Sequence, residues 1–193
     1  MRKDLVKTVK SSFLSCEKDV ETILKKLFVE NRNISDDLKR LLIINTKNCL
    51  DDKSSEVIKK TLEEKGSVSK IYSEGYIRLT PKIALDEHED VKSYILISFD
   101  NFTPNAENPE FRDCTITFDI ICHTDYWDLG NFRIRPLKIA GYVDGILNES
   151  RLSGIGTLNF MGMNELILNQ DLAGYTLMYR AIHGSDDIIP AVD

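Results

Sequence analysis

The sequence lacks several features that would place a chain quickly in a class of protein. No apolar run approaches the ~20 residues that a membrane-spanning helix needs, and Met1 to Asp4 are not followed by the apolar core of a signal peptide. The four cysteines are scattered without a Cys-x-x-Cys pair, which suits reduced thiols better than a disulfide framework. We therefore expect a cytoplasmic product that does not bind a membrane.

An excess of basic residues is also missing. The 193 residues include 25 Lys and Arg against 31 Asp and Glu, a net charge of −6, which argues against a protein that coats DNA by neutralising phosphates. The charge is unevenly spread, because residues 1–65 carry +3 and residues 66–193 carry −9. The two parts are expected to present different surfaces.

Motifs for catalysis or metal binding are not found. Cys114 and Cys122 share one predicted strand and lie roughly 26 Å apart at ~3.3 Å per residue, too far for one ion. The acidic residues 86–90 offer oxygen ligands but lack the glycine and spacing of an EF-hand loop, so a solvated loop is expected. Ser153 lacks the flanking glycines of a nucleophile elbow. We predict no enzymatic activity, no metal and no cofactor.

What the chain does contain is helical periodicity over its first 65 residues. Apolar residues recur there at three- and four-residue steps. The pattern predicts a long helix from Leu5 to Phe28 and, after a break at Asn31 to Asn33, a second helix. That helix has Ser35 as its N-cap and reaches Cys49. A short third helix is predicted after Ser54, with Gly66 as its left-handed C-terminal cap.

The hydrophobic period changes to two after Gly66, which indicates strands. The predicted elements are an extended segment 71–79, strands at 94–99, 113–123 and 173–183, a bent or interrupted strand over 154–160 and 163–168, and a helix that Pro136 opens and Asn148 ends. Residues 184–193 are predicted to be a mobile tail. The fold class is α+β: a mostly antiparallel sheet with one helix packed across a face, forming a core at 66–193 after an N-terminal helical segment at 1–65.

Two segments are candidates for contacts with other molecules. Asp100 to Arg112 exceeds a simple hairpin and is either a projecting β-arm or a flexible loop. Tyr126, Trp127 and Phe132 cluster with Arg133 between the best strand and the helix. An exposed set of this kind is typical of an interface hot spot, although the same aromatic residues would also suit the open end of a core.

Residues 81–184 resemble the tail-terminator and head-to-tail joining family of long-tailed bacteriophages. The resemblance covers a little over half the chain and lies in the arrangement of its segments. These are the entry Arg78-Leu79-Thr80-Pro81-Lys82-Ile83, the strand Tyr94 to Phe99, the strand Thr115 to Ile121, the helix Arg135 to Leu147, and the closing segment Gly174 to Arg180. The helical part before Gly66 is longer than the family core requires.

This resemblance implies a structural subunit of the virion, assembled in the host cytoplasm, that carries out no catalysis. Six copies would form a ring at the head-proximal end of the tail. The ring would stop growth of the tail tube and join it to the head. Its partners would be itself, the tail-tube protein and a head-completion or connector protein, with phage DNA only passing through the lumen. Another neck or tail-completion protein is the first alternative; a regulator that binds through the basic N-terminal helices is a distant one.

Within such a ring we expect two kinds of surface residue. Contacts with neighbours would use the arm, the polar face of the strand 113–123 and the aromatic segment, and so comprise Phe102, Phe111, Thr115, Thr117, Asp119, Tyr126, Trp127, Phe132 and Arg133. An acidic lumen would reduce sticking of DNA. The candidates for it are Asp86, Glu87, Glu89, Asp90, Asp125 and Asp128. The opposite charge biases of the two parts would steer neighbours together, or are unrelated solvated faces.

Overall fold

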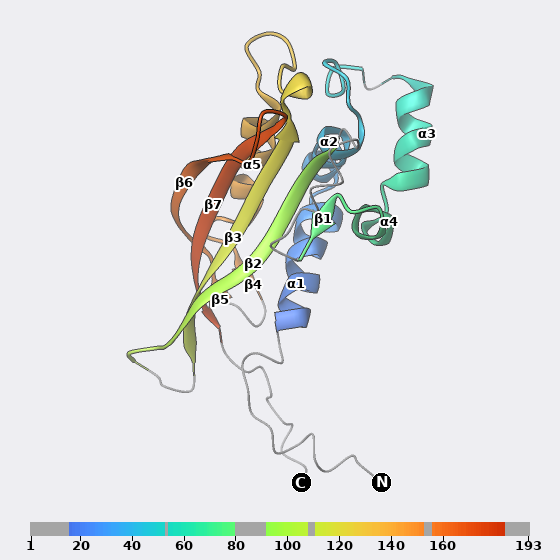
Figure 1. The fold of residues 1–193 in the computed structure, drawn as a ribbon. Coiled ribbons are helices and arrows are strands. Elements are labelled where there is room, and N and C mark those ends of the chain that lie inside the picture. Colours follow the sequence, from blue (N-terminus) through green and yellow to red (C-terminus); the bar gives the residue numbers. More distant parts are fainter. Residues whose placement is uncertain (1–15, 53, 80–91, 108–110, 153–155, 184–193) are drawn as a thin grey trace, which may run out of the picture.

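The computed structural model describes residues 16–52, 54–79, 92–107, 111–152 and 156–183. A twisted five-stranded sheet spans the molecule, in the order β1-β2-β3-β7-β6 (Figure 1). Its strands are β1 (Ile77–Arg78), β2 (Ser93–Pro104), β3 (Arg112–His123), β6 (Asn159–Ile167) and β7 (Leu172–His183). β1 pairs with β2 in parallel, and every other pair is antiparallel. A separate two-stranded ribbon joins β4 (Arg151–Leu152) to β5 (Gly156–Thr157).

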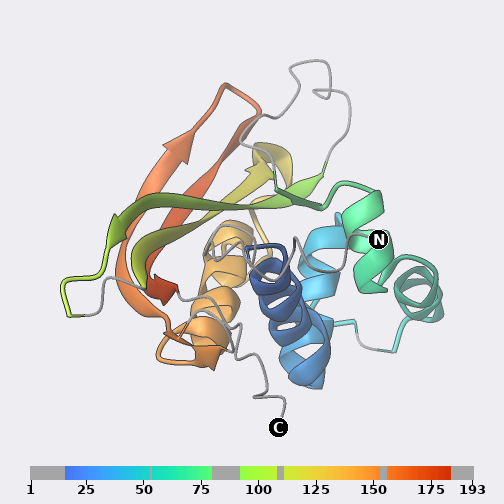
Figure 2. The ribbon, with the colours of Figure 1, turned by 90° about the horizontal axis from the view of Figure 1, so that it is seen from below.

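The helices gather on one face of this sheet. Figure 2 shows the sheet curving around α5 (Arg135–Leu147), α1 (Cys16–Lys25) and α2 (Arg32–Ile43). A π-helical turn, Lys26–Glu30, links α1 to α2, and α3 (Glu56–Lys65) and α4 (Val68–Ser73) lie to the side of β1. The predicted α+β class is confirmed, and the face that receives α5 also receives the N-terminal helices.

One hydrophobic core joins the helical segment to the sheet. Along β3 the residues Ile116, Phe118 and Ile120 are fully buried toward the helices, as their alternation predicts. The same core contains side chains from α1, α2 and α5, among them Ile23, Leu27, Leu41, Ile139 and Val143. α3 ends at Lys65, and a further helix, α4, follows it before the sheet begins.

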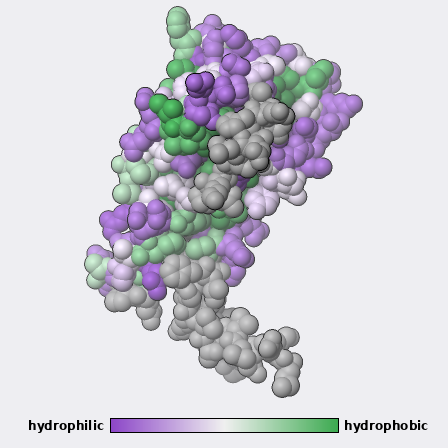
Figure 3. Space-filling model, in the orientation of Figure 1, coloured by the Kyte–Doolittle hydropathy of each residue, from purple (hydrophilic) through white to green (hydrophobic). Residues whose placement is uncertain are grey.

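The opposite face of the sheet mixes polar pairs with a small apolar cluster. Ser98 hydrogen-bonds Thr117 across β2 and β3, and the Thr176 hydroxyl donates to Asp119 at 2.5 Å. Tyr94, Leu96, Ile121 and Leu172 form the apolar cluster. The space-filling view has hydrophilic and hydrophobic residues side by side (Figure 3).

Three predicted details near the helices are wrong. Ser35 is not an N-cap, because α2 begins at Arg32 and the buried Ser35 hydroxyl instead donates to the Leu27 carbonyl at 2.7 Å. The same helix ends at Ile43 rather than reaching Cys49. Gly66 has φ −81 rather than a left-handed conformation. A glycine is needed there because a Cβ would lie 2.3 Å from the Leu62 carbonyl oxygen.

Two further boundaries differ from the prediction. The third helix is capped by Ser55, whose hydroxyl accepts from the Ile58 amide, and not by Ser54. Residues 71–79 are extended only at β1, because Ser67 caps the short helix α4 by accepting from the Lys70 amide. The N-terminal part of the first predicted helix and the predicted tail at 184–193 lie outside the described residues.

Of the two predictions for residues 100–112, the projecting arm is confirmed. β2 and β3 remain paired as far as Pro104 and Arg112, with a bulge between Asp100 and Thr103. Asn101 takes up that irregularity with φ 53, a conformation that asparagine tolerates better than most residues. The arm extends past the rest of the sheet at the lower end of Figure 1.

Candidate docking turn

A short turn at the other end of the sheet has the most unusual local structure in the described part of the chain. β3 ends at His123, a 3₁₀ turn covers Thr124–Tyr126, and an isolated bridge pairs Asp128 with Ile134 just before α5 begins. Residues 128–134 therefore form a closed turn. It projects beyond the end of the sheet, in gold at the top of Figure 1.

Three consecutive residues of this turn are left-handed. Gly130 has φ 73, Asn131 has φ 52 and Phe132 has φ 61. Glycine adopts this region freely, but a phenylalanine there costs on the order of 1–3 kcal/mol and persists only where the surroundings hold it. The neighbouring contacts supply that restraint.

Arg133 is the main restraint. Its guanidinium forms a bidentate pair with Asp51, with N–O distances of 2.8 and 2.5 Å, and so anchors the turn to the loop between α2 and α3. The same side chain donates to the carbonyls of Gly130 and Leu129 at 3.2 and 3.1 Å. The hydrogen bonds from Arg133 lower the pKa of Asp51, so the pair is fully charged at neutral pH.

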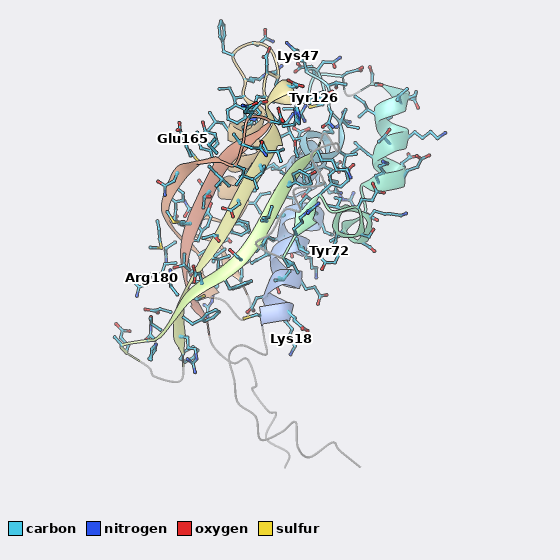
Figure 4. The ribbon with its side chains drawn as sticks, in the orientation of Figure 1. Lys18, Lys47, Tyr72, Tyr126, Glu165 and Arg180 are labelled. Carbon is cyan, nitrogen blue, oxygen red and sulfur yellow. The ribbon has the colours of Figure 1, made fainter. Side chains whose placement is uncertain are left out.

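Asp128 restrains the first half of the turn. One carboxylate oxygen accepts the Gly130 amide at 2.7 Å, and the other accepts Lys47 at 2.7 Å. Lys47 and then the Gly130 amide lower the pKa of this carboxyl. Figure 4 places Lys47 and Tyr126 together at this end of the molecule.

Arg135 fixes the base of the turn from inside the core. Its side chain is completely buried, and it donates to the carbonyls of Leu41, Ile44 and Thr46 at 2.6, 3.0 and 2.9 Å. A fourth bond, 2.8 Å long, reaches the carbonyl of Tyr126. The cation thus meets the carboxyl end of α2, where the partial charge of the helix is negative.

The turn exposes the aromatic side chain of Phe132. Phe132 has a relative exposure of 106%, while Leu129, three residues before it, is buried. An aromatic side chain on a backbone that is already restrained loses less entropy when it becomes buried in a partner than one on a flexible loop. The turn therefore presents Phe132 to solvent, and this position makes it a candidate for contact with another molecule.

The other aromatic residues of the predicted set have a different position. Trp127 is partly buried against the core, stacks on Tyr175, and donates its indole N–H to the Cys122 carbonyl at 3.2 Å. Tyr126 packs edge-on against His123. Of the two interpretations that the sequence leaves open, closure of the core describes Trp127, and display describes Phe132.

The remaining predicted contact residues do not come together with Phe132. Phe102 packs on the core at the arm, and Phe111 is partly exposed near the start of β3. The turn lies past the other end of β3, some eleven residues or roughly 36 Å away at ~3.3 Å per residue. Thr115, Thr117 and Asp119 lie between them on the sheet face away from the helices.

The acidic residues predicted for a lumen are only partly described. Asp125 is exposed, with a carboxylate oxygen 3.7 Å from His123 Nδ1, and Asp128 is paired with Lys47. Asp86, Glu87, Glu89 and Asp90 lie outside the described residues.

Within the described ranges, no group of three or more His, Cys, Asp or Glu side chains is placed to hold a metal ion. No described helix is long and apolar enough to cross a membrane. The described pockets include two apolar ones of about 480 and 460 Å³ beside α1.

The sequence predicted some residues of this site and missed others. Phe132 and Arg133 were among the predicted contact residues, but the role of Arg133 in holding the turn was not predicted. Arg135 was missed as a functional support, since its partners at Leu41, Ile44 and Thr46 lie about ninety positions earlier in the chain. Only its position beside Pro136 at the start of a helix could have been read from the sequence.

These features define an α+β protein with an exposed aromatic residue on a hydrogen-bonded turn, a candidate docking site, at one end of its sheet. The family model YomW matches residues 35–181, about three quarters of the chain, which therefore belongs to the YomW family. The name is that of a gene of the Bacillus phage SPBc2 type, and it associates the chain with bacteriophage. No curated protein matches the chain at a significant level.

Proposed function

We propose that this chain is a non-enzymatic structural subunit of a phage virion. In this proposal it forms a ring, with six copies expected, at the head-proximal end of the tail. The ring ends growth of the tail tube and joins the tail to the head. Two lines support the proposal: the phage association of the YomW family and the resemblance of residues 81–184 to tail-terminator proteins.

The observation that carries the proposal is the position of Phe132. A ring that caps a tube needs one contact with its ring neighbours and a second contact, at one end of each subunit, with the tube or the head. The turn that carries Phe132 projects at the end of the sheet, beyond the last residue of β3 (Figure 1), and the side chain of Phe132 is fully exposed. Its exposure and its restraint by Arg133 suit a contact along the strand direction.

The predicted partners follow from this arrangement. The tail-tube protein and a head-completion or connector protein are the candidates for the pocket that receives Phe132, and phage DNA would only pass through the lumen. Asp125 and Asp128 lie near the same end of the subunit. They are the described acidic residues that we propose for the lumen or its rim.

A tube-length experiment tests the function. Purified tail-tube protein of the same phage is polymerised with and without this chain, and tube lengths are measured by electron microscopy. We expect the wild-type chain to shorten the tubes and to leave a density at one end. Equal lengths and bare ends would contradict the proposal.

Phe132 offers the matched control for that experiment. Phe132→Gly removes the ring but suits the left-handed backbone, and it is expected to leave tubes long. Asn131→Gly changes the neighbouring left-handed residue, keeps the aromatic ring, and is expected to act like the wild type. If Phe132→Gly caps tubes normally, the chain still terminates tubes but does so through another surface.

A further inference from the structure

β6 is an edge strand with little of the usual protection against pairing. Edge strands of monomeric proteins are commonly blunted by lysine, proline or inward-facing charge. β6 contains neither lysine nor proline. Its protection is limited to a bulge between Phe160 and Gly162 and to one charge, Glu165, on the helix-covered face. Its exposed apolar side chains include Phe160, Met161, Met163 and Ile167, the last with a relative exposure of 75%. An exposed apolar row of this kind marks a contact site.

Among the described residues, the opposite edge of the sheet is also largely unpaired. β1 covers β2 only at Ile95 and Leu96, and no other described strand pairs with that side of β2. The Ile95 amide donates to the Tyr76 carbonyl across this edge. Because successive peptide groups of a strand alternate in direction, the backbone groups of Ile97 and Phe99 face the same way.

An apolar pocket adjoins each edge on the helix-covered face of the sheet. Beside β2, a pocket of about 480 Å³ is lined by Val20, Leu79, Ile97 and Phe99 among others. Beside β6, a smaller pocket of about 260 Å³ lies between Leu137 of α5 and the side chains of Phe160 and Met163. Figure 4 shows the two edges on opposite sides of the molecule, with Glu165 on the β6 side and Tyr72 on the β1 side.

We infer that β6 of one copy pairs with the β1–β2 edge of a second copy, so that the sheets join head to tail. The inference rests on the proposed ring and identifies its lateral contact. β6 runs antiparallel to β1 and β2 within one sheet. Rotation about an axis along the strands preserves these directions, so the two edges of neighbouring copies meet as an antiparallel pair.

The register of the sheet matches the two edges level by level. Through the pairings across β7 and β3, Phe160 lies level with Phe99, and Met163 lies level with Ile97. All four side chains are on the helix-covered face. Pairing without an axial shift therefore sets Phe160 against Phe99 as a cross-strand aromatic pair, beside the larger pocket.

The charges at the two edges favour the contact between β6 and the β1–β2 edge over the pairing of two β6 edges. The upper part of the β6 edge and its turn carry Glu165 and Asp171, with no basic residue between Asn159 and Leu172. At the same end of the other edge lie Arg78 and Lys92, each stacked on a tyrosine ring. Two β6 edges carry charge of the same sign and offer no attraction to one another, whereas unlike edges attract.

Edge variants test the inference by measuring mass in solution with light scattering. One variant carries Met163→Lys and Ile167→Lys on β6; the other carries Leu79→Lys at the opposite edge. Val57→Lys is the matched control, since Val57 on α3 is 76% exposed, like Ile167 at 75%. Thermal unfolding by circular dichroism confirms that each variant is folded. We expect the wild type and Val57→Lys to assemble, and each edge variant to have the mass of one chain.

Mixing the two edge variants gives the sharper result. Each retains one intact edge, so the mixture is expected to form a one-to-one dimer and to grow no further. Dimers of Leu79→Lys alone would mean that β6 pairs with β6, and would overturn the inference. It is also overturned if the wild type stays monomeric at millimolar concentration or if the β6 variant assembles like the wild type.

The tube-length experiment separates this inference from the proposed function. A chain that shortens tubes while its edge variants assemble normally keeps the function and loses the edge contact. A chain whose edge variants are monomeric but whose wild type leaves tubes unchanged keeps the contact and loses the function.

Discussion

The guanidinium of Arg135 donates to the carbonyl of Leu41 at 2.6 Å, across 94 positions of the sequence and without any exposure to solvent. This bond joins the start of α5 to the end of α2. Arg135 also contacts the residues just before the turn, because its backbone amide donates to the Trp127 carbonyl at 2.8 Å. The same residue therefore connects the helical segment to the turn that carries Phe132. The position of Phe132 thus depends on a residue that no partner would touch.

Replacement of Arg135 is expected to be strongly destabilising. Arg135→Met keeps much of the side-chain volume but leaves four carbonyl groups without their donor, and a buried polar group left unpaired costs about 1–3 kcal/mol. We expect the free energy of unfolding to fall by at least about 3 kcal/mol in urea titrations. Arg180→Met is the control, since Arg180 forms an exposed pair with Asp113, and such pairs contribute about 0–1 kcal/mol. Equal effects of the two substitutions would contradict the buried clamp.

Removal of the Phe132 ring is expected to separate stability from binding. Phe132→Gly relieves a left-handed phenylalanine, so the free energy of unfolding should be unchanged or rise by up to about 1 kcal/mol. Binding to the partner that receives the Phe132 side chain should weaken by at least about 2 kcal/mol, the usual loss at a hot spot. Calorimetric titration with the tail-tube and head-completion proteins measures the second effect. If Phe132→Gly lowers the free energy of unfolding and leaves both affinities unchanged, the phenyl group of Phe132 stabilises the fold and does not bind these partners.

The sheet was largely predictable because its signals are local. The alternation along Asp113 to His123 and the proline that marks the start of α5 each lie within one element; the structure confirms the alternation and begins the helix one residue earlier, at Arg135. The left-handed Phe132 was not predictable, since its conformation results from Arg133, Asp51 and Asp128, which bring together two distant loops. The short helix α4 replaced a predicted extended segment because Ser67 caps it, a cue that the alternating apolar residues obscured. The exposure of β6 depends on strand order, which hydrophobic periodicity does not encode.

The docking turn should loosen in acid. The folded-state pKa values of Asp51 and Asp128 are lowered, by Arg133 and by Lys47 respectively. Groups of this kind stabilise the fold above the unfolded-state pKa of about 4, and that contribution is lost as the pH falls through the lower folded-state value. The free energy of unfolding of the wild type should therefore fall more steeply below about pH 4 than that of Asp51→Asn. Parallel curves for the two proteins would show that the Asp51–Arg133 pair contributes nothing to stability.

Thiol labelling is expected to distinguish one cysteine from the other three. Burial raises the pKa of Cys114 and of Cys122 to about 12 in each case, and Cys49 is also buried. The thiolate is the reactive form, so these three should react slowly with an aromatic disulfide reagent at pH values near 8. Cys16 is partly exposed and should react first. Mass spectrometry should find one label per native chain and four labels in urea. Early labelling of Cys122 would instead show that β3 separates from the helices in the native protein.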